Sequence, residues 1–419
     1  MLKHRGIWVF LVCLVLLPLA AAAADDMDGP PGFDSWDAVL EEARGQTLNW
    51  HMWGGSDAWN NFVDTVYGGE LMENYGVTLN RVPLADTVDA VNQVLSEEEA
   101  GVAHDAGTVD LIWINGENFK TLKQAGLLYG PWTLNVPNSK YLDWENGGFL
   151  LDFGEPIDYS EQPWAAGAFQ WIYDTARMDA EDLPRSYAEL GEWIGANPGR
   201  FTYVAPGPGA FQGTRIVKQL MYELCGGPEP FAAFDQSVWD ECAPQAWEVL
   251  NAWEANLWRE GTTYPATANE LNELFANNEV DFSLTLTGTG AARGIASGQL
   301  PETAKAYLFD ANMISGFSYL AIPVNSANKA AALVMGNLLV RPDMQAAQLD
   351  TNSLGTGATP VVDFSTLSAE EVQAFADIAA AIVGAADPAE FAALVPNTAS
   401  EYHTLTEQDW ERCVLRDEC

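Results

Sequence analysis

The chain has 419 residues, of which 48% are hydrophobic and 19% are charged. This composition supplies enough apolar surface for a large core and excludes an intrinsically disordered protein, and at roughly 150 residues per domain the length predicts two or three domains. Acidic residues number 59 against 19 basic residues, so the formal net charge is −40. A chain this negative is excluded as a protein that binds nucleic acid or an anionic membrane by neutralising phosphates.

The first 24 residues have the pattern of a secretory signal peptide. A basic start precedes an apolar stretch from Gly6 to Leu19, and alanines fill residues 20–24. We therefore expect cleavage before Asp25 and a periplasmic mature protein. The acidity of an exported protein also indicates a saline habitat, in which ions screen self-repulsion, with an ordinary acidic secreted protein as the alternative.

The cysteines beyond the signal peptide are Cys225, Cys242, Cys413 and Cys419. An even number in an oxidising compartment favours disulfides, and proximity favours the pairs 225–242 and 413–419, although three pairings are open. A zinc site is the alternative. However, no Cys-x-x-Cys spacing occurs and the four histidines do not cluster along the chain, so we expect neither a metal nor a cofactor.

Strand and helix patterns alternate along the chain after an acidic leader with a short helix (residues 25–44). Apolar runs predict strands at 48–53, 77–82 and 109–114, each followed by a helix whose apolar residues recur at the helical period. Three such units in succession predict a parallel sheet that is covered by helices on both faces.

The second half of the chain shows further strands and helix starts. Residues 129–163 have no clear period, whereas residues 167–173 predict a strand and residues 280–287 alternate most strictly. The capping-box pattern predicts helix starts at Ser186, Thr267, Ser368 and Thr404.

Several segments resemble one protein family. Val109 to Asn118 (VDLIWINGEN), Gly167 to Arg177 (GAFQWIYDTAR), Leu274 to Phe282 (LFANNEVDF) and the run from Gly316 to Gln345 follow one another as in the extracytoplasmic solute-binding proteins of ABC importers. The resemblance is to the two-lobed, maltose-binding-like type. Together with residues 109–118, Trp53-Gly-Gly and Leu128 to Trp132 (LYGPW) most resemble the YnjB-like subgroup.

The resemblance implies an α/β protein with the periplasmic-binding-protein type II fold, in which crossover strands join two lobes around a ligand cleft. The expected division is residues 45–165 with 288–312 for lobe 1, and residues 166–287 with 313–419 for lobe 2. Crossovers are expected near residues 164–177, 283–290 and 313–319. Such a protein captures a small polar solute as a monomer and delivers it to an inner-membrane permease that a cytoplasmic ATPase drives.

The candidate ligand-binding residues lie beyond strand ends and at a helix start, where ligands bind in open α/β sheets. The candidates in the first lobe are Trp53, Gly54, Gly55, Ser56, Asp86, Asn115, Gly116, Glu117 and Asn118. The candidates in the second lobe and its crossings are Trp171, Gln212, Gly213, Thr214, Arg215, Thr287 and Gly288. A structural role is the alternative for each of them: the glycines turn the chain, the hydroxyl and carboxyl groups cap helices, Arg215 pairs with a carboxylate, and Trp171 packs in the core.

A secreted carbohydrate-active hydrolase with an acidic, tryptophan-lined cleft is the alternative function. The chain has many carboxylates for an acid–base pair, but the sequence singles out no pair, so we name no catalytic residue. For a receptor, a sugar, polyol, thiamine-like heterocycle, polyamine or metal chelate all fit the sequence. A bare metal ion is disfavoured because ligand clusters are missing at the strand ends.

Overall fold

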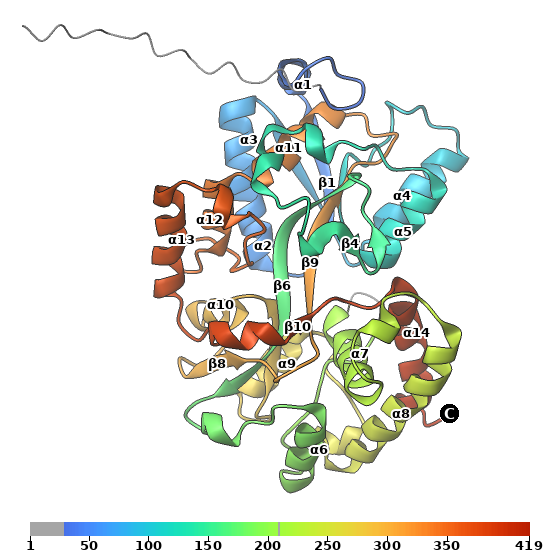
Figure 1. Cartoon of the computed structure of the whole chain (residues 1–419), viewed down its shortest axis with the longest axis vertical. Helices are drawn as coiled ribbons and strands as arrows, with labels where there is room; N and C mark the ends of the chain where they lie inside the picture. Colours follow the sequence, from blue (N-terminus) through green and yellow to red (C-terminus); the bar gives the residue numbers. More distant parts are fainter. Residues whose placement is uncertain (1–28, 208–209) are drawn as a thin grey trace, which may run out of the picture.

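The computed structural model describes residues 29–207 and 210–419, so the predicted signal peptide lies outside the described residues. The described chain forms two lobes, one above the other in Figure 1. Two long strands, β6 (Glu161–Asp174) and β9 (Met313–Ala321), run between the lobes. The fold therefore consists of two α/β halves that share their longest strands.

The bounds of the elements agree with the predicted order of strands and helices. The other strands are β1 (Thr47–Trp53), β2 (Thr78–Leu84), β3 (Leu111–Ile114), β4 (Leu151–Asp152), β5 (Glu155–Pro156), β7 (Ser283–Thr287), β8 (Ala304–Tyr307) and β10 (Leu394–Val395). The helices are α1 (Trp36–Ala43), α2 (Asp57–Phe62), α3 (Gly68–Tyr75), α4 (Val88–Glu99), α5 (Gly116–Ala125), α6 (Tyr187–Ala196), α7 (Phe211–Leu224), α8 (Gln236–Trp253), α9 (Ala268–Ala276), α10 (Gly290–Ala296), α11 (Lys329–Leu339), α12 (Pro342–Leu349), α13 (Ala369–Ala381) and α14 (Ser400–Trp410).

The strands follow one hydrogen-bonded path in the order β2-β1-β3-β9-β6-β7, with β8 paired to β6 and β10 paired to β9. The first three strands are parallel, as predicted, whereas β9 is antiparallel to both β3 and β6. The path is continuous between the lobes because each crossover strand pairs in both of them. β6 pairs with β9 along its first half and with β7 and β8 along its second half.

Buried side chains form separate cores in the two lobes. In lobe 1, one core lies between the sheet and helices α1, α2, α3 and α11, and a second core lies under α4 and α5. Helices thus cover both faces of the sheet, as the sequence predicts. The core of lobe 2 gathers residues of α6, α7, α8, α9 and α14.

The packing corrects the expected division of the chain. Ala291, Leu300 and Tyr307 pack in the core of lobe 2, so residues 288–312 do not belong to lobe 1. Conversely, Leu320 and Leu333 pack in the core of lobe 1. The reason is that the chain stays in lobe 2 after β7 and returns to lobe 1 only along β9. The expected crossing at 283–290 is therefore wrong, and we propose that the third crossing precedes β10.

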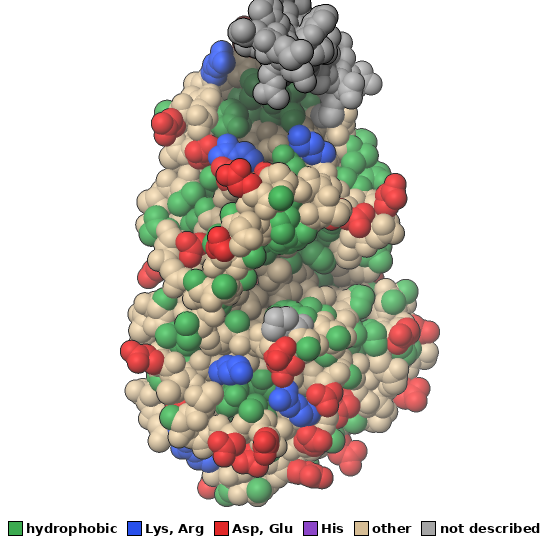
Figure 2. Space-filling view, turned by 60° about the vertical axis from the view of Figure 1, so that its left-hand side comes forward, with side chains coloured by type: hydrophobic (Ala, Val, Ile, Leu, Met, Phe, Trp, Pro, Cys, Tyr) green, Lys and Arg blue, Asp and Glu red, His purple; other side chains and the backbone are tan. Residues whose placement is uncertain are grey.

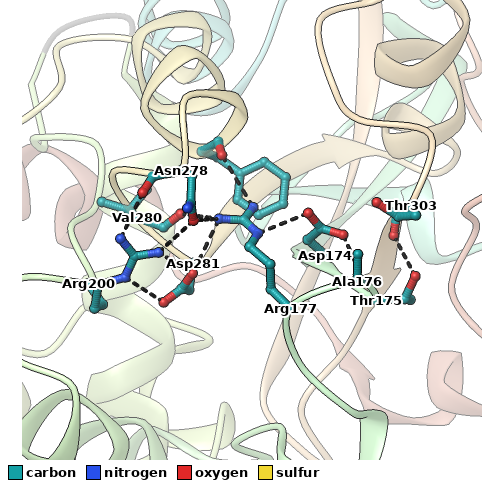
Figure 3. Close-up of polar contacts among 10 residues, drawn as sticks. Asp174, Thr175, Ala176, Arg177, Arg200, Asn278, Val280, Asp281 and Thr303 are labelled. Carbon is teal, nitrogen blue, oxygen red and sulfur yellow. Dashed lines mark hydrogen bonds and ion pairs between the residues drawn. The ribbon is translucent and has the colours of Figure 1, made fainter.

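A polar network holds the end of β6 that lies far from lobe 1 (Figure 3). Arg177 donates to Asp174 at 2.9 Å and to Asp281 at 3.2 Å, and Arg200 donates to the same Asp281 at 2.5 Å. The carbonyl oxygen of Val280 also accepts from Arg177 at 3.1 Å. The alternating pattern predicts that this strand begins at Val280. In the structure, β7 begins at Ser283, because residues 280 and 281 are held in this network.

Helix caps and disulfides confirm most local predictions. Ser186, Thr267 and Ser368 each cap a helix by accepting a hydrogen bond from the backbone three residues later. Thr404 does not, because α14 already begins at Ser400 and Thr404 lies inside it. The disulfides join Cys225 to Cys242 and Cys413 to Cys419, the pairs that proximity favours.

Candidate functional site

The ends of β1 and β2 carry polar groups at the lower edge of lobe 1. Trp53 is half-buried, and its ring centroid lies 6.4 Å from that of Trp113. Ser56 caps α2 by accepting from the backbone of Trp59, and Asp86 accepts from the backbone N–H of Val88 at 3.0 Å. Ser56 and Asp86 therefore cap helices, which is the structural role given above as the alternative to ligand binding. Both side chains remain partly exposed.

The turn after β3 brings Asn115 to Asn118 to the same edge. The Asn115 amide donates to the carbonyl oxygen of Phe317 on β9 at 2.5 Å, and the Gly116 N–H donates to the Asp152 carboxyl group. Gly116 has a φ of 57°, and a Cβ atom there would lie 2.8 Å from the Phe153 ring, so the turn requires glycine. The turn thus holds the N-terminus of α5 against β9.

Glu117 and Asn118 form the first turn of α5, in which Asn118 is buried and Glu117 is half-buried. The Asn118 amide donates to Glu117 Oε1 at 3.1 Å. Among the described residues, Glu117 Oε2 has no hydrogen-bond partner although it is buried. Buried polar atoms in folded proteins are rarely left unpaired, so this oxygen is available to a ligand.

Charged side chains of lobe 2 face Glu117. Lys218 of α7 donates to Asn397 Oδ1 at 2.8 Å, and its Nζ lies 3.3 Å from His403 Nδ1 of α14. On its other side, the His403 ring places Nε2 3.3 Å from Glu407 Oε1. Lys218, His403 and Glu407 therefore form a row of titratable groups on the side of lobe 2 that faces lobe 1.

Burial shifts the pKa values of this row away from their values in water. It lowers the pKa of Lys218 to about 7, with Arg215 adding to the effect, and lowers the pKa of His403 to about 3. Burial raises the pKa of Glu407 to about 7. It also raises the pKa of Glu117, although the charge of His403 acts in the opposite direction. Acidic and basic side chains with shifted pKa values at one interface are typical of a binding site, where the polar groups of a solute replace the water lost on burial.

Phe153 and one ion pair bring the lobes into contact on this side. The Phe153 ring of lobe 1 lies 4.8 Å from Lys218 Nζ and 5.6 Å from the His403 ring centroid. Beside it, Lys120 of α5 pairs with Glu401 of α14 at 2.5 Å. The space-filling outline nevertheless narrows between the lobes in Figure 2. In this structure the two lobes are therefore in contact beside Lys218 and His403.

The predicted residues of α7 are all buried or half-buried. Gly213 lies against the backbone of residues 204–206, and Thr214 is buried with its hydroxyl donating to the Phe211 carbonyl at 3.1 Å. Gln212 is half-buried at the helix start. Arg215 is 8% exposed and forms no ion pair with a carboxylate within residues 29–207 and 210–419, so the alternative of such a pairing is wrong.

Among the predicted residues near the crossings, Trp171 has a structural role. Trp171 is 1% exposed and packs against Phe169 with ring centroids 4.9 Å apart, which gives it the core role that was its alternative. Gly288 accepts a hydrogen bond from the Gln170 amide at 3.0 Å and lies close to Thr359. Thr287 is half-buried at the end of β7. Trp171 therefore leaves the candidate site.

Sequence reasoning missed Phe153, Lys218, His403 and Glu407. Lys218 follows Arg215 by three residues, and Glu407 follows His403 by four, so each pair shares one helix face. That spacing, in a chain with few basic residues, is the signal that would have found them. Phe153 carries no such signal because it lies in an irregular segment.

Further findings concern metals and membranes. Within residues 29–207 and 210–419, no group of three or more His, Cys, Asp or Glu side chains is placed to hold a metal ion. In the same residues, no helix is both long and apolar enough to cross a membrane.

Sequence comparison identifies the family. The profile of the bacterial extracellular solute-binding proteins matches residues 68–380. The protein YnjB of Escherichia coli K12 is 35% identical over 353 residues, which are 83% of this chain and 85% of YnjB. This chain belongs to the bacterial extracellular solute-binding protein family. It is a solute-binding protein of the kind that serves ABC importers, and neither the family nor its relatives support the hydrolase alternative.

Solved structures confirm the type II periplasmic binding fold. The substrate-binding protein PotD of a spermidine/putrescine ABC transporter from Streptococcus pneumoniae superimposes with a TM-score of 0.58 at 14% identity, covering 87% of this chain and 98% of PotD. Iron-bound HitA from Pseudomonas aeruginosa gives a TM-score of 0.54 at 16% identity, with 87% and 98% covered. The family consists of extracellular proteins that bind a solute.

Proposed function

We propose that this solute-binding protein captures a small polar solute between its lobes as a monomer and passes it to a permease that a cytoplasmic ATPase drives. The main observation behind the proposal is that Glu117 of lobe 1 faces Lys218 and His403 of lobe 2. Lys218 and His403 are buried, and Glu117 retains a buried oxygen with no partner in the described part of the chain. A solute between the lobes would bind groups of both lobes and so favour their closed arrangement.

The proposed site keeps the predicted residues that lie at the strand ends of lobe 1, at the start of α7 and at the end of β7. It consists of Trp53, Gly54, Gly55, Ser56, Asp86, Asn115, Gly116, Glu117 and Asn118 from lobe 1, with Gln212, Gly213, Thr214, Arg215, Thr287 and Gly288 on the other side. To these we add Lys218 and His403, and we leave out the buried Trp171. The half-buried rings of Trp53 and Trp113 supply an apolar wall, and Glu117 supplies a polar group.

We also propose that residues 1–24 are a signal peptide that is removed on export to the periplasm. The excess of acidic residues supports a saline habitat. Acidic side chains stand on both lobes in Figure 2, and dissolved ions would screen the repulsion between them.

The double variant Glu117→Ala with Asn118→Ala tests the site. The solute that co-purifies with the wild-type protein is released by denaturation, identified by mass spectrometry and added back to refolded protein. We expect it to stabilise the wild type by about 2.7 kcal/mol at a hundredfold excess over Kd. We expect no stabilisation of the double variant, because the polar first turn of α5 is gone.

The matched control is Glu73→Ala with Asn74→Ala, the same dipeptide on the exposed surface of α3. It should respond to the solute as the wild type does. An unchanged response of the Glu117/Asn118 variant would remove these residues from the site. Chemical turnover of the solute would contradict the receptor function itself.

A further inference from the structure

Arg215 is the feature of this molecule that the proposed function leaves unexplained. Seven arginines pair with carboxylates, as is natural in a chain with so many acidic residues: Arg81, Arg177, Arg185, Arg200, Arg341, Arg412 and Arg416. Arg215 is more buried than any of these, at 8% exposed, yet it forms no such pair within the described residues. A buried charge without a partner costs several kcal/mol unless something else compensates it.

Two nitrogens of the Arg215 guanidinium group are free. Both Nε and Nη1 are buried and have no hydrogen-bond partner in the part of the chain that the structure describes. Bidentate arginine–carboxylate pairs in this protein use Nε and Nη2, as Arg81 does with Asp64, and the Nε of Arg215 on that edge has no partner in the described residues. The unpaired N–H groups of Arg215 are therefore available as donors to an oxyanion.

The guanidinium group lies over the crossover strand β9, at the waist between the lobes. A Cβ atom on Gly316 would be 2.7 Å from Arg215 Nη2, so glycine makes room for the guanidinium group. Residues 315–318 of β9 are half-buried, although the strand is fully buried on both sides of this stretch. Arg215 thus lies beside the one partly accessible stretch of the crossover strand.

A second buried cation lies on the same face of α7. Lys218 is one turn further along, and burial together with the charge of Arg215 lowers its pKa. Lys218 already has partners in Asn397 and His403. Lys218 is thus hydrogen-bonded, whereas two nitrogens of Arg215 have no partner within the described residues.

We propose that Arg215 is the anchor of an oxyanion subsite, so that the solute of this receptor carries a carboxylate or phosphate group. This inference rests on the proposed function and narrows its solute to anionic or zwitterionic molecules. The overall negative charge does not oppose it, because local buried cations set the field at the subsite.

The variant Arg215→Met tests the subsite, because methionine keeps most of the packing and removes the charge. The probes are inorganic phosphate and acetate, each compared with sodium chloride at equal ionic strength, and the readout is the midpoint of thermal unfolding. For the wild type we expect at least one probe to raise the midpoint above the chloride control, and the stronger probe tells phosphate from carboxylate. For Arg215→Met we expect this rise to be lost.

Stability without any probe gives a second readout. Removing an uncompensated buried charge should leave the midpoint of Arg215→Met at or above that of the wild type, whereas an arginine that stabilises the fold would lower it. Gly316→Ala offers an independent route, since its methyl group displaces the guanidinium group, and it should weaken the affinity for the probe at least tenfold. The matched control Arg185→Met removes an arginine that is paired with Glu390 and should keep the probe response.

The subsite is overturned if neither probe acts beyond chloride, or if Arg215→Met keeps the wild-type response. The co-purifying solute separates this inference from the proposed function. A solute that binds the wild type and Arg215→Met equally well leaves the receptor function intact and contradicts the subsite alone. Loss of all solute binding by the Glu117/Asn118 variant, together with such a result, would place recognition on lobe 1.

Discussion

Replacing Trp171 with alanine is expected to destabilise the protein by about 3–5 kcal/mol, the range for truncation of a buried tryptophan. The Trp171 ring is 1% exposed and lies 5.8 Å from the Phe201 ring and 5.7 Å from the Phe309 ring, measured between centroids. The loss would be a large part of the 5–15 kcal/mol that stabilises a typical domain. Denaturant unfolding followed by circular dichroism measures it.

Two further variants locate the effect. Trp171→Phe keeps an aromatic ring in the core and should lose less stability than Trp171→Ala. Phe234→Ala removes an aromatic side chain that is 38% exposed on the same lobe, and it should cost less than about 1 kcal/mol. If Trp171→Ala instead kept its stability but lost affinity for the solute, Trp171 would belong to the site and our exclusion of it would be wrong.

Replacing Asp110 with alanine is expected to destabilise lobe 1 by about 2–6 kcal/mol, since two partly buried backbone N–H groups would lose their acceptor at about 1–3 kcal/mol each. Asp110 is fully buried and accepts from the Asn49 N–H at 2.9 Å and from the Asn328 N–H at 3.0 Å. It also accepts from the Ser326 hydroxyl at 3.0 Å. Asp110 thus ties β1 and the start of α11 to the segment that enters β3.

Chemical unfolding of Asp110→Ala and of a control measures this cost. The control is Asp64→Ala, which removes a half-exposed carboxylate that pairs with Arg81 at 2.8 Å. An exposed ion pair of this kind contributes less than about 1 kcal/mol. Equal losses in the two variants would show that Asp110 does not tie β1 and α11 to the segment that enters β3.

Local patterns in the sequence were enough to predict the strands of lobe 1 and the turn after β3. A hydrophobic run that ends abruptly at Asn115 predicts both the strand and the polar strand end. The type II fold followed from the order of such segments and from their resemblance to a family. Short sequence separation likewise favoured both disulfide pairs.

Long-range packing could not be predicted. Burial along β6 covers almost every residue on both faces, so alternation could not tell whether Trp171 faces a cleft or a core. Lys218 and His403 meet although 185 residues separate them. Residues 288–312 belong to lobe 2 because the chain returns from lobe 2 to lobe 1 along β9 and not along β7. No local sequence pattern distinguishes these two possibilities.

A crystal structure of the protein with its co-purified solute tests most directly whether the solute binds between the lobes. The account predicts a solute that contacts the first turn of α5 on one side and α7 on the other, with an oxyanion group on Arg215. A solute bound on the outer surface of a single lobe, away from both helices, would contradict it.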